Sequence, residues 1–286
     1  MTRAGGGEPA AEPGELPGGL PGKLSGEPLP GGMANSGAVH RDGAAVDRPA
    51  PPAAPALHAQ LRALRAAGFG GAPLPLAAPV NGRERLTYLP GDVPLPPFPA
   101  WAMTDEALRS VGVLLRGLHD ASTGLPRPAD APWSRELSDP RGGPVLCHND
   151  VCPENVVFRA GRAHALIDFD LAAPGRRVWD VAMTARYWAP LTGETSWQHP
   201  AGLDPLARVR ILADAYGLQP AARAEFAHVS REVGASCRAF VAARVARGDE
   251  TYVQGLADGG GWARFDRVEQ WLRDAAHDIT RALTAR

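Results

Sequence analysis

The amino-acid sequence predicts an α+β fold, with short strands toward the N-terminus and helices through most of the C-terminal half. Two observations predict the strands. Apolar residues flank an Asp-Gly turn in the stretch 39–46, and the apolar runs 155–158 and 163–167 flank a second turn that contains glycine. A third observation predicts the helices, because apolar residues recur at helical spacing in 104–119 and in three segments beyond residue 204.

Composition is that of a soluble globular protein. Of the 286 residues, 44% are hydrophobic and 21% are charged, which allows one large or two modest domains. The net charge of −1 gives no electrostatic reason to expect nucleic acid or an anionic membrane as a partner. Apolar runs stay well short of the roughly 18 residues of a membrane span. The three cysteines do not suggest a disulfide framework. We expect a cytoplasmic protein, and its oligomeric state is left open.

The first 32 residues differ sharply from the rest. About half of the residues in 1–32 are glycine or proline, and large apolar side chains are scarce. Such a segment cannot bury enough surface to offset the entropy of ordering it. We therefore expect a disordered tail that the fold does not need, with Met33 as an alternative start of translation.

Residues 33–91 combine strands with one helix. The hairpin of 39–46 is followed by a predicted helix from Ala56 to Gly68, where leucines recur at i, i+4 and i+7. A short strand is predicted within 74–80, and another over Leu86–Leu89, which Pro90-Gly91 ends.

The C-terminal part is predicted to be mostly helical. Thr104 supplies a hydroxyl cap, and two acids follow it at the positive end of the first helix. Asp180 is read as the N-cap of another helix, and Asp204 as the cap of a helix whose first position is proline. Apolar stripes over 226–240 and 265–283 mark the two remaining helices.

Three oxygen-bearing side chains lie on two loops at the ends of the central hairpin. Asp150 precedes the hairpin, Asn155 opens its first strand, and Asp168 follows its second strand. The hairpin should bring Asn155 and Asp168 together at its open end. A carboxylate and an amide oxygen side by side suit Mg²⁺. Asp150 can accept a proton from an attacking hydroxyl, which is the arrangement of phosphoryl transfer. His148 is expected to support this loop rather than to transfer protons.

The pattern HxDxxxxN from His148 to Asn155, followed by I-D-F-D at 167–170, resembles the catalytic and metal-binding loops of the aminoglycoside phosphotransferase family. That family shares the two-lobed protein-kinase-like fold. The resemblance implies Asp150 as the catalytic base, with Asn155 and Asp168 as Mg²⁺ ligands. It also implies that Asp180 braces the catalytic loop.

The resemblance divides the chain into three parts. After the tail of 1–32, residues 33–91 form the N-lobe and hinge on the nucleotide side. Residues 92–286 form the C-lobe with the catalytic loop, the metal site and the acceptor pocket. The backbone of the hinge, at Tyr88 and Leu89, would hydrogen-bond the adenine of ATP.

The expected function is Mg²⁺-dependent transfer of the γ-phosphoryl group of ATP to a hydroxyl of a small molecule. The alternative is a non-catalytic kinase-like binding or immunity-type module that has lost turnover. Kinase-like enzymes place a strand lysine, paired with a helix glutamate, on the phosphates, and neither occurs in 45–49 or the following helix. Arg48 is the first candidate to replace the lysine. A register slip of one residue would turn Arg48 away and Asp47 inward.

The acceptor is not identified by the sequence, and neither is the choice between ATP and GTP. The C-terminal half carries arginines among its acids, with no acidic run. A polycationic antibiotic is therefore not favoured as the acceptor.

Overall fold

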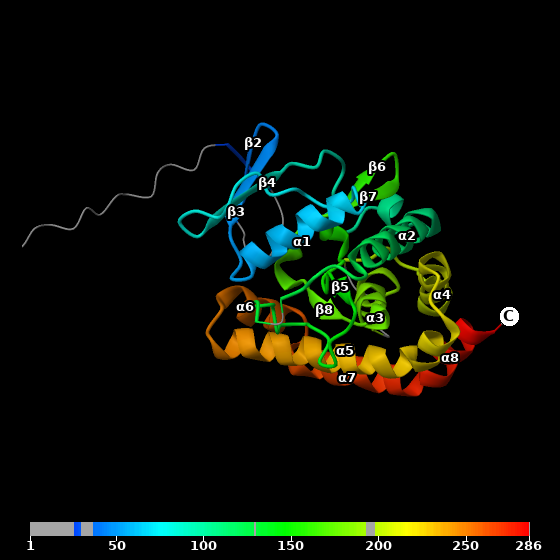
Figure 1. Cartoon of the computed structure of the whole chain (residues 1–286). Helices are drawn as coiled ribbons and strands as arrows, with labels where there is room; N and C mark the ends of the chain where they lie inside the picture. Colours follow the sequence, from blue (N-terminus) through cyan, green and yellow to red (C-terminus); the bar gives the residue numbers. More distant parts are fainter. Residues whose placement is uncertain (1–25, 30–36, 129, 193–197, 286) are drawn as a thin grey trace, which may run out of the picture.

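The computed structural model describes residues 26–29, 37–128, 130–192 and 198–285. It is a two-lobed α+β fold in which a small sheet and one helix sit above a larger helical lobe (Figure 1). The two-lobed, kinase-like architecture implied by the catalytic motif is therefore confirmed.

The N-lobe is an antiparallel sheet with the order β1-β2-β3-β4. The Asp-Gly hairpin forms as predicted, and helix α1 connects β3 to β4. The bounds are β1 Glu27–Pro28, β2 His40–Asp42, β3 Ala45–Pro49, α1 Ala54–Ala66 and β4 Arg83–Thr87. The strand predicted within 74–80 is reduced to two isolated bridges that run beside β4. Prolines at 73, 75 and 79 remove ladder donors there, which explains the difference.

Strand β1 lies inside the segment 1–32 that composition predicts to be disordered. Glu27 pairs with Arg41 of β2, so the expected disorder does not hold for these few residues. The remainder of that segment, 1–25 and 30–32, lies outside the described residues.

Removal of the tail should still leave stability almost unchanged. A chain that starts at Met33 should melt within about one or two degrees of the full chain, because Glu27 and Pro28 are exposed and contribute little packing. A second chain that starts at residue 25 keeps β1 and serves as the control. Thermal unfolding of both checks the prediction. A large loss confined to the Met33 chain would mean that β1 stabilises the sheet. A large loss in both chains would mean that residues 1–24 pack on the fold.

The segment that follows β4 pairs with the larger lobe. The N–H of Asp92 donates to the carbonyl oxygen of Phe158 at 2.9 Å, and the N–H of Phe158 donates back at 2.8 Å. This close approach requires Gly91, which has a φ of 155°. A Cβ atom at Gly91 would lie 2.4 Å from the carbonyl oxygen of Phe158. Residues 91 and 92 are thus fixed against the strand that contains Phe158.

The C-lobe is built on α2, whose predicted apolar stripe is fully buried. Leu108, Val111, Leu115 and Leu118 have no exposed surface, and the hydroxyl of Thr104 accepts the N–H of Ala107 at 3.2 Å as the predicted cap. The hairpin β6–β7 and the short pair β5–β8 carry the site loops. The bounds are α2 Asp105–Ser122, β5 Val145–Cys147, β6 Val156–Arg159, β7 Arg162–Leu166, β8 Ala173–Gly175 and α3 Arg177–Trp188.

Five helices follow residue 204 where the sequence predicts three. The stripe over 226–240 belongs to one long helix, and the stripe over 265–283 is divided at Ala275 between two helices. The bounds are α4 Pro205–Tyr216, α5 Pro220–Ala246, α6 Glu250–Asp258, α7 Gly261–Asp274 and α8 Ala276–Thr284. Among the described residues, the helices are all too short or too polar to cross a bilayer.

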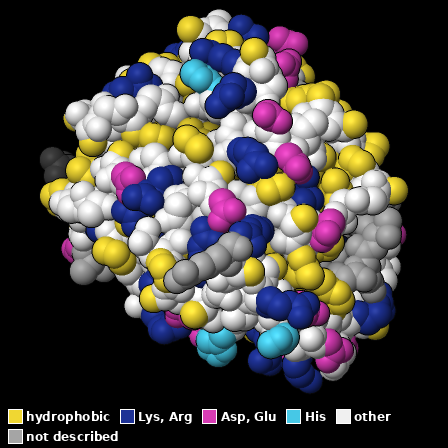
Figure 2. Space-filling model, turned by 90° about the vertical axis from the view of Figure 1, so that its right-hand side faces the viewer, with side chains coloured by type: hydrophobic (Ala, Val, Ile, Leu, Met, Phe, Trp, Pro, Cys, Tyr) yellow, Lys and Arg dark blue, Asp and Glu magenta, His cyan; other side chains and the backbone are white. Residues whose placement is uncertain are grey.

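The net charge of −1 comes from nearly equal numbers of basic and acidic residues. Basic and acidic side chains are interspersed on the face shown in Figure 2, and neither sign forms a continuous field there. This face offers no broad charged surface to a polyanion.

Candidate active site

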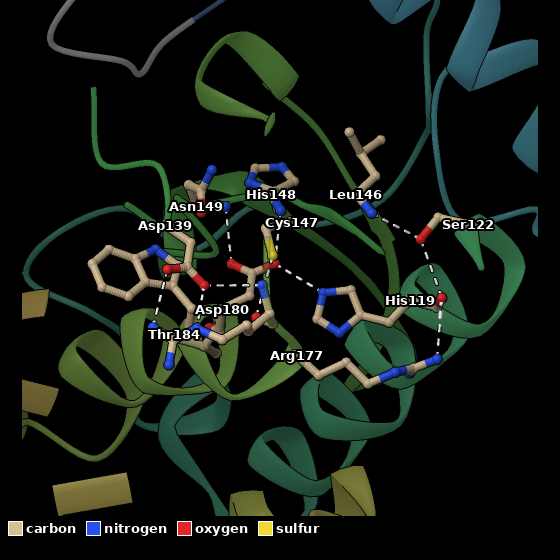
Figure 3. Close-up of polar contacts among 12 residues, drawn as sticks. His119, Ser122, Asp139, Leu146, Cys147, His148, Asn149, Arg177, Asp180 and Thr184 are labelled. Carbon is tan, nitrogen blue, oxygen red and sulfur yellow. Dashed lines mark hydrogen bonds and ion pairs between the residues drawn. The ribbon is translucent and has the colours of Figure 1, made fainter. Parts of the chain in front are cut away.

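Asp180 holds the loop that carries Asp150. Its buried carboxylate accepts hydrogen bonds from the backbone N–H groups of His148, at 2.7 Å, and Asn149, at 2.9 Å. The Nε2 atom of His119 lies 3.0 Å from the same carboxylate (Figure 3). Burial alone would raise the pKa of Asp180, but the hydrogen bond and charge of His119, with the contacts of His148, hold that pKa below its usual value.

Asp180 is therefore not a helix N-cap. Arg176 occupies the cap position of α3, and Asp180 lies inside the first turn with its carboxylate directed at the loop that carries Asp150. The sequence-based assignment as a cap was wrong, because a cap residue cannot be told from a first-turn acid without the contacts it makes. The bracing role implied by the family resemblance matches these contacts.

His148 connects the two site loops. Its ring Nε2 donates to the carbonyl oxygen of Ile167 at 2.9 Å, one residue before Asp168. The ring is fully buried, and this burial lowers the pKa of His148. A buried ring with this hydrogen bond joins the two loops, which is the contact that a supporting role requires.

Asp150 is held by two neighbours. One carboxylate oxygen accepts the hydroxyl of Tyr187 at 3.0 Å, and the other accepts the side-chain amide of Asn155 at 3.0 Å. Burial raises the pKa of Asp150 to about 6, and the charge of Asp168 adds to this, while Tyr187 and Arg186 oppose it. A carboxylate of this pKa is ionised at neutral pH and still basic enough to accept a proton in a reaction.

Asn155 and Asp168 meet at the open end of the hairpin, as predicted. The N–H of Ile167 donates to the carbonyl oxygen of Asn155 at 3.0 Å, which fixes the two strand ends together. Asp168 has a φ of 62°, a conformation that is uncommon for residues other than glycine and that gathers at functional sites.

The donor atoms at this end of the hairpin fit a magnesium ion. The amide nitrogen of Asn155 donates to Asp150, which leaves its amide oxygen as a ligand atom. One carboxylate oxygen of Asp168 accepts a hydrogen bond from Arg48. In the part of the chain that the structure describes, the other oxygen accepts none. An amide oxygen and a carboxylate oxygen are the hard ligands that Mg²⁺ prefers.

Arg48 points into the site, which settles the register that the sequence left open by one residue. Its Nε donates to Glu84 at 2.7 Å and its Nη1 donates to Asp168 at 2.9 Å, while Nη2 pairs with Asp170. Asp47 faces the other side of β3, where it pairs with Arg83. We call Arg48, Glu84, Asp168 and Asp170 the arginine–carboxylate cluster. Burial and the charge of Asp168 raise the pKa of Asp170, which Arg48 opposes.

The glutamate that pairs with Arg48 comes from a strand rather than from the helix. Glu84 lies directly opposite Arg48 in the β3–β4 ladder, and its second oxygen lies 2.6 Å from Nε2 of His58 on α1. Sequence reasoning missed both residues. The alternation of buried Glu84 and Leu86 along β4 was the available signal for Glu84.

A small cavity lies beside this cluster. It measures about 10 Å³, which is about the space of one water molecule. Its lining comprises Arg48, Leu57, His58, Leu61, Pro73, Glu84, Leu86, Asp168 and Phe169.

The two predicted adenine contacts differ in availability. The backbone N–H of Tyr88 donates to the carbonyl oxygen of Ala44 at 2.8 Å, so the sheet already uses this donor. The guanidinium of Arg41 lies 3.9 Å from the centre of the Tyr88 ring. Tyr88 therefore cannot offer its N–H to adenine as the structure stands, and contact through Leu89 remains a prediction.

A braced acid loop, an amide and carboxylate pair after it, and a basic strand residue paired with a glutamate define the class of kinase-like phosphotransferases. The chain belongs to the phosphotransferase enzyme family, whose model matches residues 129–226. The trifolitoxin immunity protein of Rhizobium leguminosarum bv. trifolii is 32% identical over 198 residues, which are 66% of this chain and 73% of that protein. The family resemblance seen in the sequence is confirmed.

Two solved structures share the fold. A choline/ethanolamine kinase family protein from Mesorhizobium loti superposes with a TM-score of 0.60 at 18% identity, over 86% of this chain and 88% of that chain. A protein from Ralstonia eutropha classed with the aminoglycoside phosphotransferases gives 0.53 at 15% identity, over 80% and 86%. Identities this low establish the architecture alone.

Proposed function

We propose that the protein is an ATP- and Mg²⁺-dependent phosphotransferase that acts on a hydroxyl of a small molecule. The observation that carries this proposal is the convergence of Asp150, Asn155 and Asp168 at the open end of the β6–β7 hairpin. Tyr187 and Asn155 hold Asp150 in place by donating hydrogen bonds to its carboxylate, which can remain ionised. The oxygens of Asn155 and Asp168 would hold Mg²⁺, which when bound offsets the charge of the phosphates.

The proposed reaction is a direct transfer of the phosphoryl group in which Asp150 and Arg48 each have one role. The acceptor oxygen bonds to the γ-phosphorus of ATP, and the bond from that phosphorus to the β–γ bridging oxygen breaks. The hydroxyl proton passes to Asp150, and ADP leaves with the electron pair of the broken bond. Arg48 would contact the phosphates from the N-lobe through the N–H donors of its guanidinium that the arginine–carboxylate cluster does not use.

Asp168 provides a direct test of the metal role. Asp168→Ala should weaken Mg²⁺-dependent ATP binding and leave metal-free nucleotide binding nearly unchanged, because only the metal-bound nucleotide contacts this carboxylate. Calorimetric titration with and without Mg²⁺ measures both. Asp274→Ala on the exposed face of α7 is the control and should change neither. An equal loss in both conditions would make Asp168 a structural residue only.

A second candidate function is binding without turnover. It is favoured by the likeness to a trifolitoxin immunity protein and by Arg48, which pairs with both Asp168 and Asp170. If Arg48 stays there when nucleotide is present, the metal ligands remain neutralised and no phosphoryl group moves. Depletion of ATP with Mg²⁺ and a panel of hydroxyl metabolites separates the two candidates.

A further inference from the structure

Arg186 lies beside the proposed catalytic base without an acid of its own. It precedes Tyr187 on α3, and the Tyr187 hydroxyl donates to Asp150 at 3.0 Å. The guanidinium carbon of Arg186 lies 5.1 Å from the centre of the Tyr187 ring. Its charge acts on the carboxylate of Asp150, which it helps to keep ionised.

Several other half-buried arginines of the C-lobe have carboxylate partners, whereas Arg127 donates to backbone carbonyl oxygens. Arg176 pairs with Asp139 at 2.6 Å and Arg244 pairs with Glu136 at 2.5 Å. Within the described residues, Arg186 makes no ion pair shorter than 4.0 Å. Its other charged or polar neighbour is Cys237 on α5, a thiol whose pKa burial raises, so that it is neutral at physiological pH.

Burial of a guanidinium costs free energy. The fold offsets this cost through the charge of Asp150 and through a hydrogen bond and a ring contact with Tyr187. These contacts use only part of its five N–H donors. A half-buried guanidinium with unused N–H donors beside Asp150 can bind an anion. Its planar fork matches a carboxylate or a phosphate with two parallel hydrogen bonds.

We infer that Arg186 forms an anion subsite of the acceptor pocket, so that the acceptor carries a carboxylate or phosphate near the hydroxyl that reacts. This inference rests on the proposed function. The same positive charge disfavours a polycationic acceptor, because like charges would meet beside Asp150. Arg186 thus selects the acceptor by charge, and Asp150 activates its hydroxyl.

Binding of matched probes to the full chain, without nucleotide, tests the subsite. Glycerol is the neutral probe, glycerate carries a carboxylate, and glycerol 3-phosphate carries a phosphate. At least one anionic probe should bind about tenfold more tightly than glycerol, and Arg186→Gln should remove that preference. Arg186→Lys should restore part of it. Arg281→Gln on α8, which removes an exposed arginine paired with Asp278, should behave as the parent.

Three results would overturn the subsite: no binding of either anion, equal binding of anions and glycerol, or an anion preference that survives in Arg186→Gln. The two anionic probes show whether a carboxylate or a phosphate is preferred. A melting curve of Arg186→Gln with circular dichroism establishes that the variant is folded.

Transfer of labelled phosphate from ATP to the same compounds separates this inference from the proposed function. An anion preference that Arg186→Gln removes, with none of the probes phosphorylated, keeps the subsite and counts against the enzyme. Phosphorylation of glycerate or glycerol 3-phosphate with the same kcat/KM in the parent and in Arg186→Gln keeps the enzyme and removes the subsite. When both hold, Arg186→Gln should raise KM for the anionic acceptor at least tenfold and change kcat much less.

Discussion

Asp150→Asn should lower turnover by about two to four decades, the usual scale for loss of a positioned proton acceptor. Asparagine has nearly the same shape as aspartate, and its amide oxygen can still accept the Tyr187 hydroxyl. Its amide nitrogen cannot accept from Asn155, but Asn155 keeps its hydrogen bond to the backbone carbonyl oxygen of residue 150, so the loop should keep its conformation. It cannot take the proton of the acceptor hydroxyl. Initial rates measure the loss, and calorimetry should show an unchanged ATP affinity. Turnover within a factor of a few of the parent would mean that Asp150 is not the base.

The rate of the same reaction should decrease at acidic pH. The base must be unprotonated, and the pKa of Asp150 is raised to about 6 by burial and by Asp168. The value of kcat/KM, which reports the free enzyme, should therefore fall as pH decreases through about 6. Tyr187→Phe removes a hydrogen bond that opposes this shift, so the fall should begin at higher pH. A profile unaffected by Tyr187→Phe would mean that another group titrates.

The sequence alone could predict those parts of the site whose residues lie close together along the chain. Asp150, Asn155 and Asp168 lie within one stretch of chain, and the hairpin between them has a strong turn signal. Spacing along this stretch is therefore enough to place the three side chains near one another. Spacing along the helix α3 is informative in the same way. Asp180 and Tyr187 are seven residues apart, so they lie on one helical face and both reach the catalytic loop. This spacing was the available signal for Tyr187.

The parts that depend on pairing between distant segments could not be predicted in full. Glu84 meets Arg48 only because β3 and β4 are adjacent with a particular register, and their residues are 36 positions apart in the chain. Asp168 lies 120 positions from Arg48. The sequence places Arg48 on a strand, but the direction of its side chain follows from the whole sheet. The loss of the helix glutamate is offset by Glu84, which propensity and spacing alone do not reveal.

Arg48→Ala should lower the free energy of unfolding by about 3–5 kcal/mol, the scale for removal of one partner from a buried ion pair. Glu84 would be left buried without the guanidinium, and Asp168 and Asp170 would repel each other. Arg48→Lys keeps the charge but loses the forked geometry, so its loss should be smaller. Asp47→Ala changes the opposite face of β3 and is the matched control, with a small effect expected. Denaturant titration measures all three, and an Arg48→Ala protein as stable as the parent would contradict the cluster's structural role.

The nucleotide affinity of the same variants decides between the two candidate functions. If Arg48 replaces the family's lysine on the phosphates, Arg48→Ala should weaken Mg·ATP binding by about 1.5–3 kcal/mol, the scale of a charged hydrogen bond. Arg48→Lys should retain most of that affinity, and Asp47→Ala should leave it unchanged. If Arg48 instead neutralises the metal ligands, its removal frees Asp168, and Mg·ATP should bind as well as before or more tightly. Calorimetry at a temperature where each variant is folded gives the answer. Tighter binding by Arg48→Ala would make the protein a kinase-like binder whose metal site is closed by its own arginine.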